Sequence, residues 1–140
     1  MKEKQYKIGY TTGVFDLFHV GHLNILKRAK EHCEHLIVGV STDELVMGYK
    51  GKFPVIPHHE RMEIVEGIKY VDKVVPQTNR DKFLAWEALQ FNVMFVGDDW
   101  KGNAIFNEVE KKFNLVGVDI IYFPYTQGVS STLVKQKITL

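Results

Sequence analysis

Residues 13–22 read Gly-Val-Phe-Asp-Leu-Phe-His-Val-Gly-His. An apolar-rich run over Tyr6–Thr12 precedes this stretch and predicts a strand, and an apolar-periodic run over Leu23–Ala29 follows it and predicts a helix. A strand that turns through glycine into a helix N-terminus makes an anion site, because free backbone N–H groups and the positive end of the helix dipole point outward there. The stretch therefore predicts phosphate binding.

Two histidines and an aspartate are the candidate reactive residues of this stretch. His19 and His22 are three residues apart, so they share one face of the first helical turn. Two imidazoles beside a phosphate-binding helix end can neutralise charge that develops during phosphoryl or nucleotidyl transfer. Gly21 has no Cβ and allows a ligand to approach the backbone closely, and Asp16 is expected to orient a histidine or to help hold a metal ion. The combination favours phosphate chemistry over a simple helix cap.

Strands and helices are expected to alternate along the chain. Five short apolar runs, most of them rich in valine and isoleucine, predict strands over Lys7–Thr12, Leu36–Val40, Val71–Val75, Val93–Val96 and Val118–Phe123. Apolar residues at helical spacing predict helices over Leu23–His32, His59–Ile68, Asp81–Gln90 and Asn103–Phe113, with Asn79 or Asp81 capping the third and a last helix beginning at Ser130–Thr132. Continuous apolar strands indicate a parallel sheet that is buried on both faces. We therefore expect one α/β domain over residues 1–140, doubly wound, with its functional crevice at the carboxyl ends of the strands.

The composition excludes several classes of protein. The 140 residues are 45% hydrophobic and 25% charged with a formal net charge of +1, which argues against a general nucleic-acid binder. Cys33 is the single cysteine, so no intrachain disulfide framework is expected and a reducing compartment suits the chain. No apolar stretch is long enough to span a membrane, and the polar residues 1–5 do not resemble a signal peptide. We expect a cytoplasmic protein without a membrane or nucleic-acid partner.

A long irregular segment is expected over Met47–Pro57, which contains two glycines and two prolines. A loop of this length in so small a domain is more often functional than passive. It carries Lys50 and Lys52, and a lysine is a mobile point charge that can close over phosphates. On the following helix, Arg61 is expected either to grip phosphate through its fork of donors or to form an ion pair on the helix surface.

Scattered histidines elsewhere do not predict a metal site. His32, Cys33 and His35 lie close together, as do His58 and His59. Structural zinc usually needs four ligands at recognised spacings, and one cysteine among scattered histidines does not supply them.

The motifs together resemble those of the cytidylyltransferase-like nucleotidyltransferases. The first is Gly-x-Phe-Asp-x-x-His-x-Gly-His over residues 13–22, and three further segments match in order: Ser41–Glu44 after the second strand, Gly97–Trp100 after the fourth, and Thr126–Thr132, which is similar to the family's Thr-x-Gly-x-Ser-Thr motif. The resemblance covers nearly the whole chain and is greatest to the small bacterial glycerol-3-phosphate cytidylyltransferases. It implies a Rossmann-like sheet of the nucleotidyltransferase type and an enzyme that joins CTP and glycerol 3-phosphate to give CDP-glycerol and pyrophosphate.

The resemblance also implies a site. The implied catalytic residues are His19, His22, Lys50, Lys52 and Arg61. The implied nucleotide contacts are Thr12, Gly13, Val14, Phe15, Asp16, Gly21, Gly97, Asp98, Tyr125, Thr126, Gly128, Ser130, Ser131 and Thr132. Mg²⁺ is expected to accompany the triphosphate, since it prefers substrate phosphates and few protein ligands. Asp16 is the one possible metal ligand among the side chains, and the family commonly forms homodimers.

Two positions depart from the pattern and leave alternatives open. Tyr125 stands where the glycerol-phosphate enzymes usually carry arginine, and Val14 stands where a hydroxyl residue is common. Tyrosine can stack on a base or donate one hydrogen bond, but it cannot replace the charge. The alternatives are a cytidylyltransferase for phosphocholine, phosphoethanolamine or another polyol phosphate, an ATP-using adenylyltransferase, a nucleotide-binding regulatory protein without catalysis, and a flavodoxin-like electron carrier.

Overall fold

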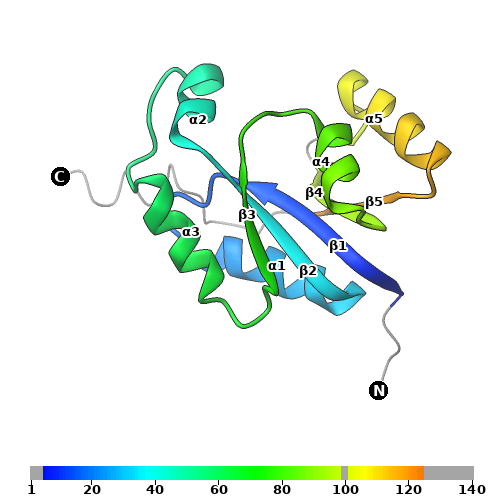
Figure 1. Ribbon diagram of the computed structural model, residues 1–140, viewed down its shortest axis with the longest axis horizontal. Coiled ribbons are helices and arrows are strands. Elements are labelled where there is room, and N and C mark those ends of the chain that lie inside the picture. Colours follow the sequence, from blue (N-terminus) through cyan, green and yellow to red (C-terminus); the bar gives the residue numbers. More distant parts are fainter. Residues whose placement is uncertain (1–4, 99–100, 125–140) are drawn as a thin grey trace.

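The computed structural model describes residues 5–98 and 101–124. Five strands form one parallel sheet in the order β3-β2-β1-β4-β5 (Figure 1). Their bounds are β1 Tyr6–Gly13, β2 Cys33–Ser41, β3 Lys73–Gln77, β4 Val93–Gly97 and β5 Asp119–Phe123. The helices are α1 Val20–His32, α2 Asp43–Lys50, α3 His58–Glu66, α4 Lys82–Leu89 and α5 Ala104–Leu115. The five expected strands and their parallel pairing are confirmed, with β3 beginning two residues later than expected.

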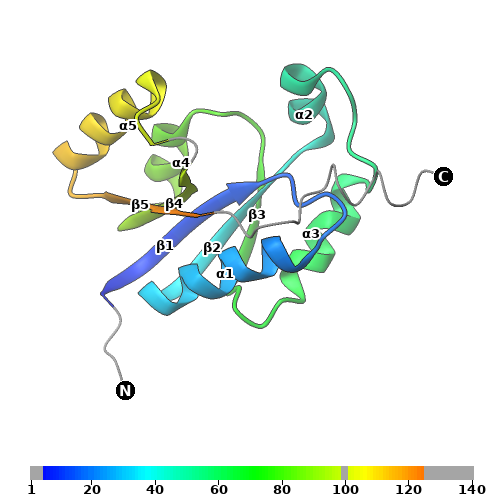
Figure 2. The same cartoon turned by 180° about the vertical axis from the view of Figure 1, so that it is seen from behind.

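The helices cover both faces of the sheet, as a doubly wound fold requires. On one face Leu26 of α1 and Val65 of α3 pack against alternate residues of β2, including Val38. On the other face Phe113 of α5 packs with Ile37 of β2 and Met94 of β4. Seen from behind, α1 runs across β1 and β2 (Figure 2). The alternation explains why β2 is apolar without interruption over Leu36–Val38, because successive side chains enter different cores.

Local sequence sets the helix starts. Asp81 is the N-cap of α4, where its carboxylate accepts the N–H groups of Phe83 and Leu84. Asn79 instead accepts the N–H of Asp81 in the preceding turn. Of the two candidate caps, the structure therefore selects Asp81.

Helix α2 was not predicted from the sequence. The prediction of an irregular segment over Met47–Pro57 is wrong for its first four residues, which form the second half of α2. The helix is only eight residues long and includes Gly48, so its apolar period is too short to detect. Thr42 caps its start by accepting the N–H of Leu45, and Gly51 ends it in the left-handed conformation at φ 75°. The irregular loop proper is therefore residues 51–57, and Lys50 belongs to the last turn of α2.

No helix within residues 5–98 and 101–124 combines the length and the apolar character that crossing a bilayer requires.

Candidate active site

A cavity of about 720 Å³ opens at the carboxyl ends of the strands. Its floor includes Gly13 of β1, Ser41 of β2, Gln77 of β3 and Gly97 of β4. From β1 the chain continues to β2 and β3 on one side of the sheet, whereas β4 and β5 lie on the other side. Open α/β sheets bind ligands at such a reversal of strand order, here between β1 and β4. The crevice expected from the alternating pattern is confirmed. Of the implied nucleotide contacts, those of the β1–α1 turn that line it are Thr12, Gly13, Val14, Phe15 and Asp16.

The turn from β1 into α1 is tightly constrained. Phe15 and Leu17 both have positive φ values, 53° and 50°, which non-glycine residues rarely adopt. A Cβ at Gly13 would lie 2.9 Å from the ring of Phe15, so only glycine fits beneath that ring. Phe15 is buried, and its ring centroid lies 5.4 Å from that of the His22 ring. The strained turn therefore aims its backbone at the cavity and supports a histidine.

His19 and His22 form a reciprocal cap at the start of α1. His19 Nδ1 accepts the N–H of Gly21 at 3.0 Å, and His22 Nδ1 accepts the N–H of His19 at 3.1 Å. The two rings stack with their centroids 3.9 Å apart. Because each Nδ1 is an acceptor, each neutral ring carries its proton on Nε2. The pair is thus held by the backbone in one tautomer, with two Nε2–H donors left for a ligand. His22 lines the cavity, and His19 is stacked on it from α1's cap position.

The surroundings of both histidines favour the neutral form of the ring. Burial, followed by the neighbouring His19 ring, lowers the pKa of His22 to about 4, while the Asp16 carboxylate opposes the shift. Burial also lowers the pKa of His19. The first turn of α1 contains no acidic side chain. An anion arriving at this helix end therefore meets free N–H groups and two neutral hydrogen-bond donors without a competing carboxylate on the same turn.

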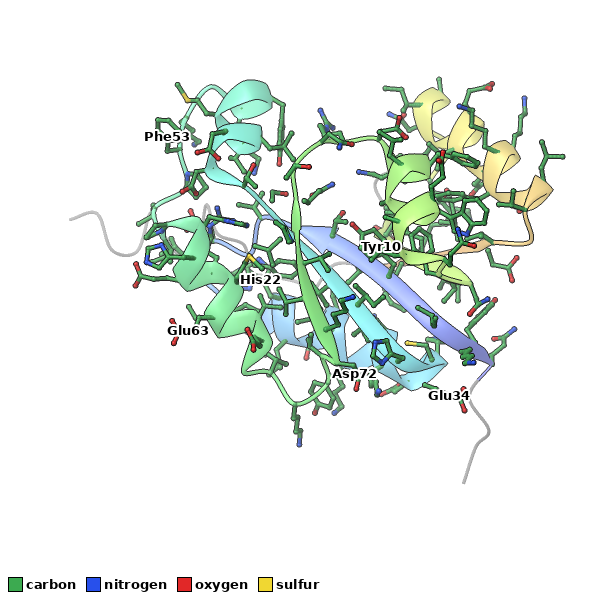
Figure 3. The ribbon with its side chains drawn as sticks, viewed as in Figure 1. Tyr10, His22, Glu34, Phe53, Glu63 and Asp72 are labelled. Atoms are coloured by element: carbon green, nitrogen blue, oxygen red, sulfur yellow. The ribbon has the colours of Figure 1, made fainter. Side chains whose placement is uncertain are left out.

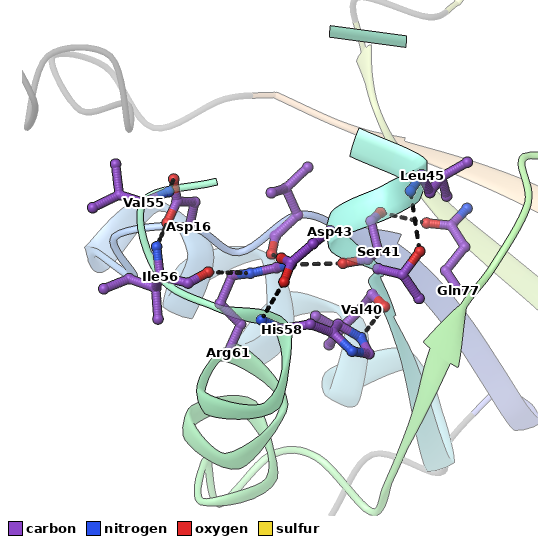
Figure 4. A network of polar contacts seen from close by, with 12 residues as sticks. Asp16, Val40, Ser41, Asp43, Leu45, Val55, Ile56, His58, Arg61 and Gln77 are labelled. Atoms are coloured by element: carbon purple, nitrogen blue, oxygen red, sulfur yellow. Dashed lines mark hydrogen bonds and ion pairs between the residues drawn. The ribbon is translucent and has the colours of Figure 1, made fainter. Parts of the chain in front are cut away.

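Asp16 anchors the loop over residues 51–57 to the β1–α1 turn. Its two carboxylate oxygens accept the backbone N–H groups of Val55, at 2.8 Å, and Ile56, at 2.9 Å (Figure 4). The side chain is 5% exposed. Both oxygens face backbone donors, so the expected metal role of Asp16 does not match its contacts. Its position instead sets where the loop carrying Lys52 stands relative to the cavity.

Arg61 is buried and joins four segments around the cavity, an arrangement called here the Arg61 brace. It therefore neither lines the cavity to contact phosphate nor forms an ion pair on the helix surface, and both predictions for it are wrong. The side chain is 0% exposed. Its guanidinium donates to the carbonyls of Ile56, Val14 and Ser41 at 2.7–2.8 Å and to the carboxylate of Asp43 at 2.6 Å (Figure 4). These partners lie on the loop, the β1–α1 turn, the end of β2 and the start of α2. Arg61 therefore positions the four segments around the cavity.

The brace is reinforced from the far side of Asp43. The second oxygen of Asp43 accepts the N–H of His58 at 3.2 Å, and the His58 ring contacts the carbonyl of Val40 at 3.0 Å. Burial opposes ionisation of Asp43, but the hydrogen bonds from Arg61 and His58 hold the pKa of this carboxyl below its ordinary value. The Asp43–Arg61 ion pair is thus present throughout the neutral range.

Among the described residues, four cationic side chains line the cavity wall. Lys50 and Lys52, which the sequence analysis identifies, are exposed at the end of α2 and in the loop. Two further cations of the lining, which the sequence did not single out, are Arg80, between β3 and α4, and Lys82, at the first position of α4. The Arg80 guanidinium lies 4.5 Å from the ring centroid of Tyr49, so it links this segment to α2. The sequence feature that could have identified Arg80 and Lys82 is their position shortly after β3, because site residues of a parallel sheet follow the carboxyl ends of its strands.

Lys82 is the most perturbed of these cations. It is half-buried at the first position of α4, and within the described residues it forms no ion pair. Burial, together with the nearby charge of Arg80, lowers the pKa of Lys82 to about 8, while Asp81 opposes the shift. A half-buried cation facing a cavity is suited to an anionic ligand, which would stabilise its charged form and raise its pKa.

The remaining expected site residues fall into two groups. Gly97 lines the cavity, Gly21 donates its N–H to His19, and Asp98 is exposed at the end of β4. The expected contacts that lie outside the described residues are Tyr125, Thr126, Gly128, Ser130, Ser131 and Thr132, together with Asp99 and Trp100 of the Gly97 motif. Among the described residues, no three His, Cys, Asp or Glu side chains gather as metal ligands.

Comparisons with known proteins agree with this geometry. A family model described as cytidylyltransferase-like matches residues 10–137. Glycerol-3-phosphate cytidylyltransferase of Bacillus subtilis (strain 168) is 35% identical over 135 residues, which cover 91% of this chain and 94% of that protein. FAD synthase of Thermococcus sibiricus is 34% identical, over 89% of this chain and 84% of that protein. The crystal structure of a lipopolysaccharide core biosynthesis protein from Thermoplasma volcanium superposes with a TM-score of 0.72 at 25% identity, covering 86% of this chain and 97% of that one.

Proposed function

The chain belongs to the cytidylyltransferase-like family, and from this premise we propose that it transfers CMP from CTP to glycerol 3-phosphate. The products are CDP-glycerol and pyrophosphate. The proposal rests on similarity to the Bacillus enzyme over nearly the full length of both chains and on a cavity built for phosphates.

The observation that carries the proposal is the reciprocal histidine cap at the N-terminus of α1. In the reaction, an oxygen of the acceptor's phosphate attacks the α-phosphorus of CTP and forms a new P–O bond. The bond from that phosphorus to the bridging oxygen breaks, and pyrophosphate leaves with the electron pair. Negative charge therefore grows on oxygens around the α-phosphorus, where the Nε2–H groups of His19 and His22 and the helix N–H groups can stabilise it.

The cations of the cavity wall supply complementary roles. Lys50, at the end of α2, and Lys52, in the loop, neutralise the triphosphate. Lys82, at the first position of α4, binds the phosphate of the acceptor, with Arg80 adding charge. Separate cations thus hold the two substrates, and positioning supplies much of the rate. Arg61 acts only through the segments that it braces.

Mg²⁺ is the proposed cofactor, and it would enter on the triphosphate. The described residues provide no cage of carboxylates, and the oxygens of Asp16 already face backbone donors. This donor set fits an ion whose ligands are mainly phosphate oxygens and water. When bound, Mg²⁺ neutralises phosphate charge and orients the leaving pyrophosphate. Excess EDTA should abolish turnover, and added Mg²⁺ should restore it.

The test is a matrix of two nucleotides and several acceptors. CTP or ATP is incubated with glycerol 3-phosphate, phosphocholine, phosphoethanolamine and pentitol phosphates, and products are identified by mass while pyrophosphate release gives the rate. We expect CDP-glycerol from CTP and glycerol 3-phosphate at the highest kcat/KM. ATP is included because an FAD synthase is nearly as similar to the chain. A clear preference for ATP, or tight CTP binding without product from any acceptor, would refute the proposal.

A further inference from the structure

A second cavity of about 220 Å³ lies beside the first, between β3 and α4. The two cavities share Gln77 and Lys82 in their walls, so they meet on either side of the Lys82 side chain. The wall of the second cavity is largely apolar along α4, where Leu84, Ala85, Ala88 and Leu89 line it. Its polar groups include the side chains of Tyr10, Thr78 and Asn79.

Tyr10 places a hydroxyl in this cavity from below. It lies on β1, on the face of the sheet that α4 and α5 cover, and it is 2% exposed (Figure 3). A Cβ at Gly39 would lie 2.6 Å from the Tyr10 Oη atom, so the glycine in the middle of β2 makes room for the hydroxyl. Within the described part of the chain, this hydroxyl forms no hydrogen bond. Burial raises the pKa of Tyr10 to about 12, so it remains a neutral donor and acceptor.

Gln77 offers a second polar group at the junction. Its Oε1 accepts the hydroxyl of Ser41 at 2.7 Å, which leaves its amide N–H groups as donors. The Lys82 ammonium stands at the same junction. The second cavity thus has a cationic mouth toward the reaction site, an apolar side along α4, and hydroxyl and amide groups around it.

We propose that this second cavity is the subsite for the hydroxylated carbon chain of the acceptor, and that it selects polyol phosphates over amino-alcohol phosphates. The inference rests on the proposed function. With the acceptor's phosphate on Lys82, its carbon chain extends along α4 and its hydroxyl groups meet the Tyr10 hydroxyl and the Gln77 amide. Six heavy atoms of a glycerol unit need roughly 180 Å³ at the volume of one water each. The 220 Å³ of the cavity is therefore sufficient for a glycerol unit.

The charge around the subsite explains the selection. Arg80 and Lys82 repel a positively charged ammonium group at the mouth of the cavity. Within the described part of the chain, the one carboxylate in the wall is that of Asp81, and its Oδ1 accepts two backbone N–H groups of α4. Among the described residues of the wall, Tyr10 is the single aromatic one, and one ring does not form a cage for a quaternary ammonium group. A neutral polyol meets none of these penalties.

Two variants test the subsite, each with a matched control. Tyr10→Phe removes only the hydroxyl, and Tyr70→Phe makes the same change on a residue that lines neither cavity. Ala88→Leu fills the cavity from an exposed position of α4, and Ala104→Leu makes the same change at an exposed position of α5 that lines neither cavity. KM is measured for glycerol 3-phosphate and for CTP by pyrophosphate release.

We expect both variants to change KM for the acceptor and to leave KM for CTP unchanged. Tyr10→Phe should raise KM for glycerol 3-phosphate about fivefold, the loss of one neutral hydrogen bond. That effect should vanish with 1-propyl phosphate, which lacks both hydroxyls. Ala88→Leu should raise KM for glycerol 3-phosphate by roughly tenfold or more, since the filled cavity no longer accepts the carbon chain. The KM for CTP and both control variants should match the wild-type protein.

The two ways of failing are distinguishable. If the wild-type protein makes CDP-glycerol but KM for glycerol 3-phosphate is unchanged in both Tyr10→Phe and Ala88→Leu, the subsite is refuted and the proposed function stands. A Tyr10→Phe effect of equal size with 1-propyl phosphate would likewise refute the hydroxyl contact. If the wild-type protein makes no CDP-glycerol, the proposed function and the subsite fall together.

Discussion

Replacing Lys82 by arginine should remove an alkaline decline in the use of glycerol 3-phosphate. Lys82 is half-buried at the cavity wall, and burial and the charge of Arg80 lower its pKa to about 8. The charged form binds the acceptor's phosphate, so deprotonation weakens that step. Arginine keeps its charge at every accessible pH, because its pKa lies above about 12.

The pKa sets the size of the effect. With a pKa near 8, about half of Lys82 is charged at pH 8 and about a tenth at pH 9. For the wild-type protein, kcat/KM for glycerol 3-phosphate should therefore fall about fivefold between pH 8 and pH 9, and about tenfold for each further pH unit. For Lys82→Arg the same parameter should stay flat between pH 7 and pH 9.5, although the plateau itself drops because the fork of donors replaces a compact ammonium.

The assay is pyrophosphate release at saturating CTP and Mg²⁺ with varied glycerol 3-phosphate. Two controls identify the titrating group. Arg80→Gln removes the neighbouring charge that lowers the pKa of Lys82, so its break should move to higher pH. Lys82→Met should be uniformly slow, with no break near pH 8. An unchanged alkaline decline in Lys82→Arg would show that another group titrates and would refute the assignment.

Three further outcomes are expected. His22→Ala should reduce turnover by orders of magnitude with an unchanged circular dichroism spectrum. His19→Asn, which keeps a capping side chain, should have the same effect. Near-normal turnover in both variants would exclude the histidine pair from catalysis. Arg61→Met should lower Tm by roughly 10 °C, since it leaves the Asp43 carboxylate and three carbonyls without their buried partner, and a Tm within a degree or two of the wild-type value would contradict the brace. The Tm of the wild-type protein should fall as pH drops from about 6.5 to about 4, because the unfolded chain binds a proton at His22 before the folded protein does; His22→Asn should flatten part of this decline, and an identical pH profile would count against the lowered pKa.

Local sequence was sufficient for much of the site at β1 and α1. The apolar run of β1, Gly13 and the two histidines all lie within about 16 residues, and the contacts that align them connect neighbours in the chain. Both cap hydrogen bonds join residues two or three positions apart. Short-range contacts of this kind are encoded in the local pattern, which is why a helix N-terminus for phosphate could be predicted.

Arg61 shows where local reasoning ends. As a residue on a helix it was expected to contact phosphate or a neighbouring acid, yet its partners Val14 and Ser41 lie 47 and 20 positions away. Complete burial of a guanidinium requires several acceptors from different segments, and only the packed sheet brings them together. Helix α2 depends on the same contacts, because Asp43 in its first turn is the ionic partner of Arg61.

The sequence by itself determined the parallel sheet, the edge at which ligands bind and the histidine pair, because periodicity, glycine positions and helix caps act over a few residues. Tertiary structure alone decided which charges face the cavity. It turned Arg61 and Asp16 into anchors, since both side chains form hydrogen bonds with backbone groups that are distant in the sequence. It also brought Lys82 and the Tyr10 hydroxyl to adjoining cavities, because the environment of a side chain depends on which helices and strands pack around it.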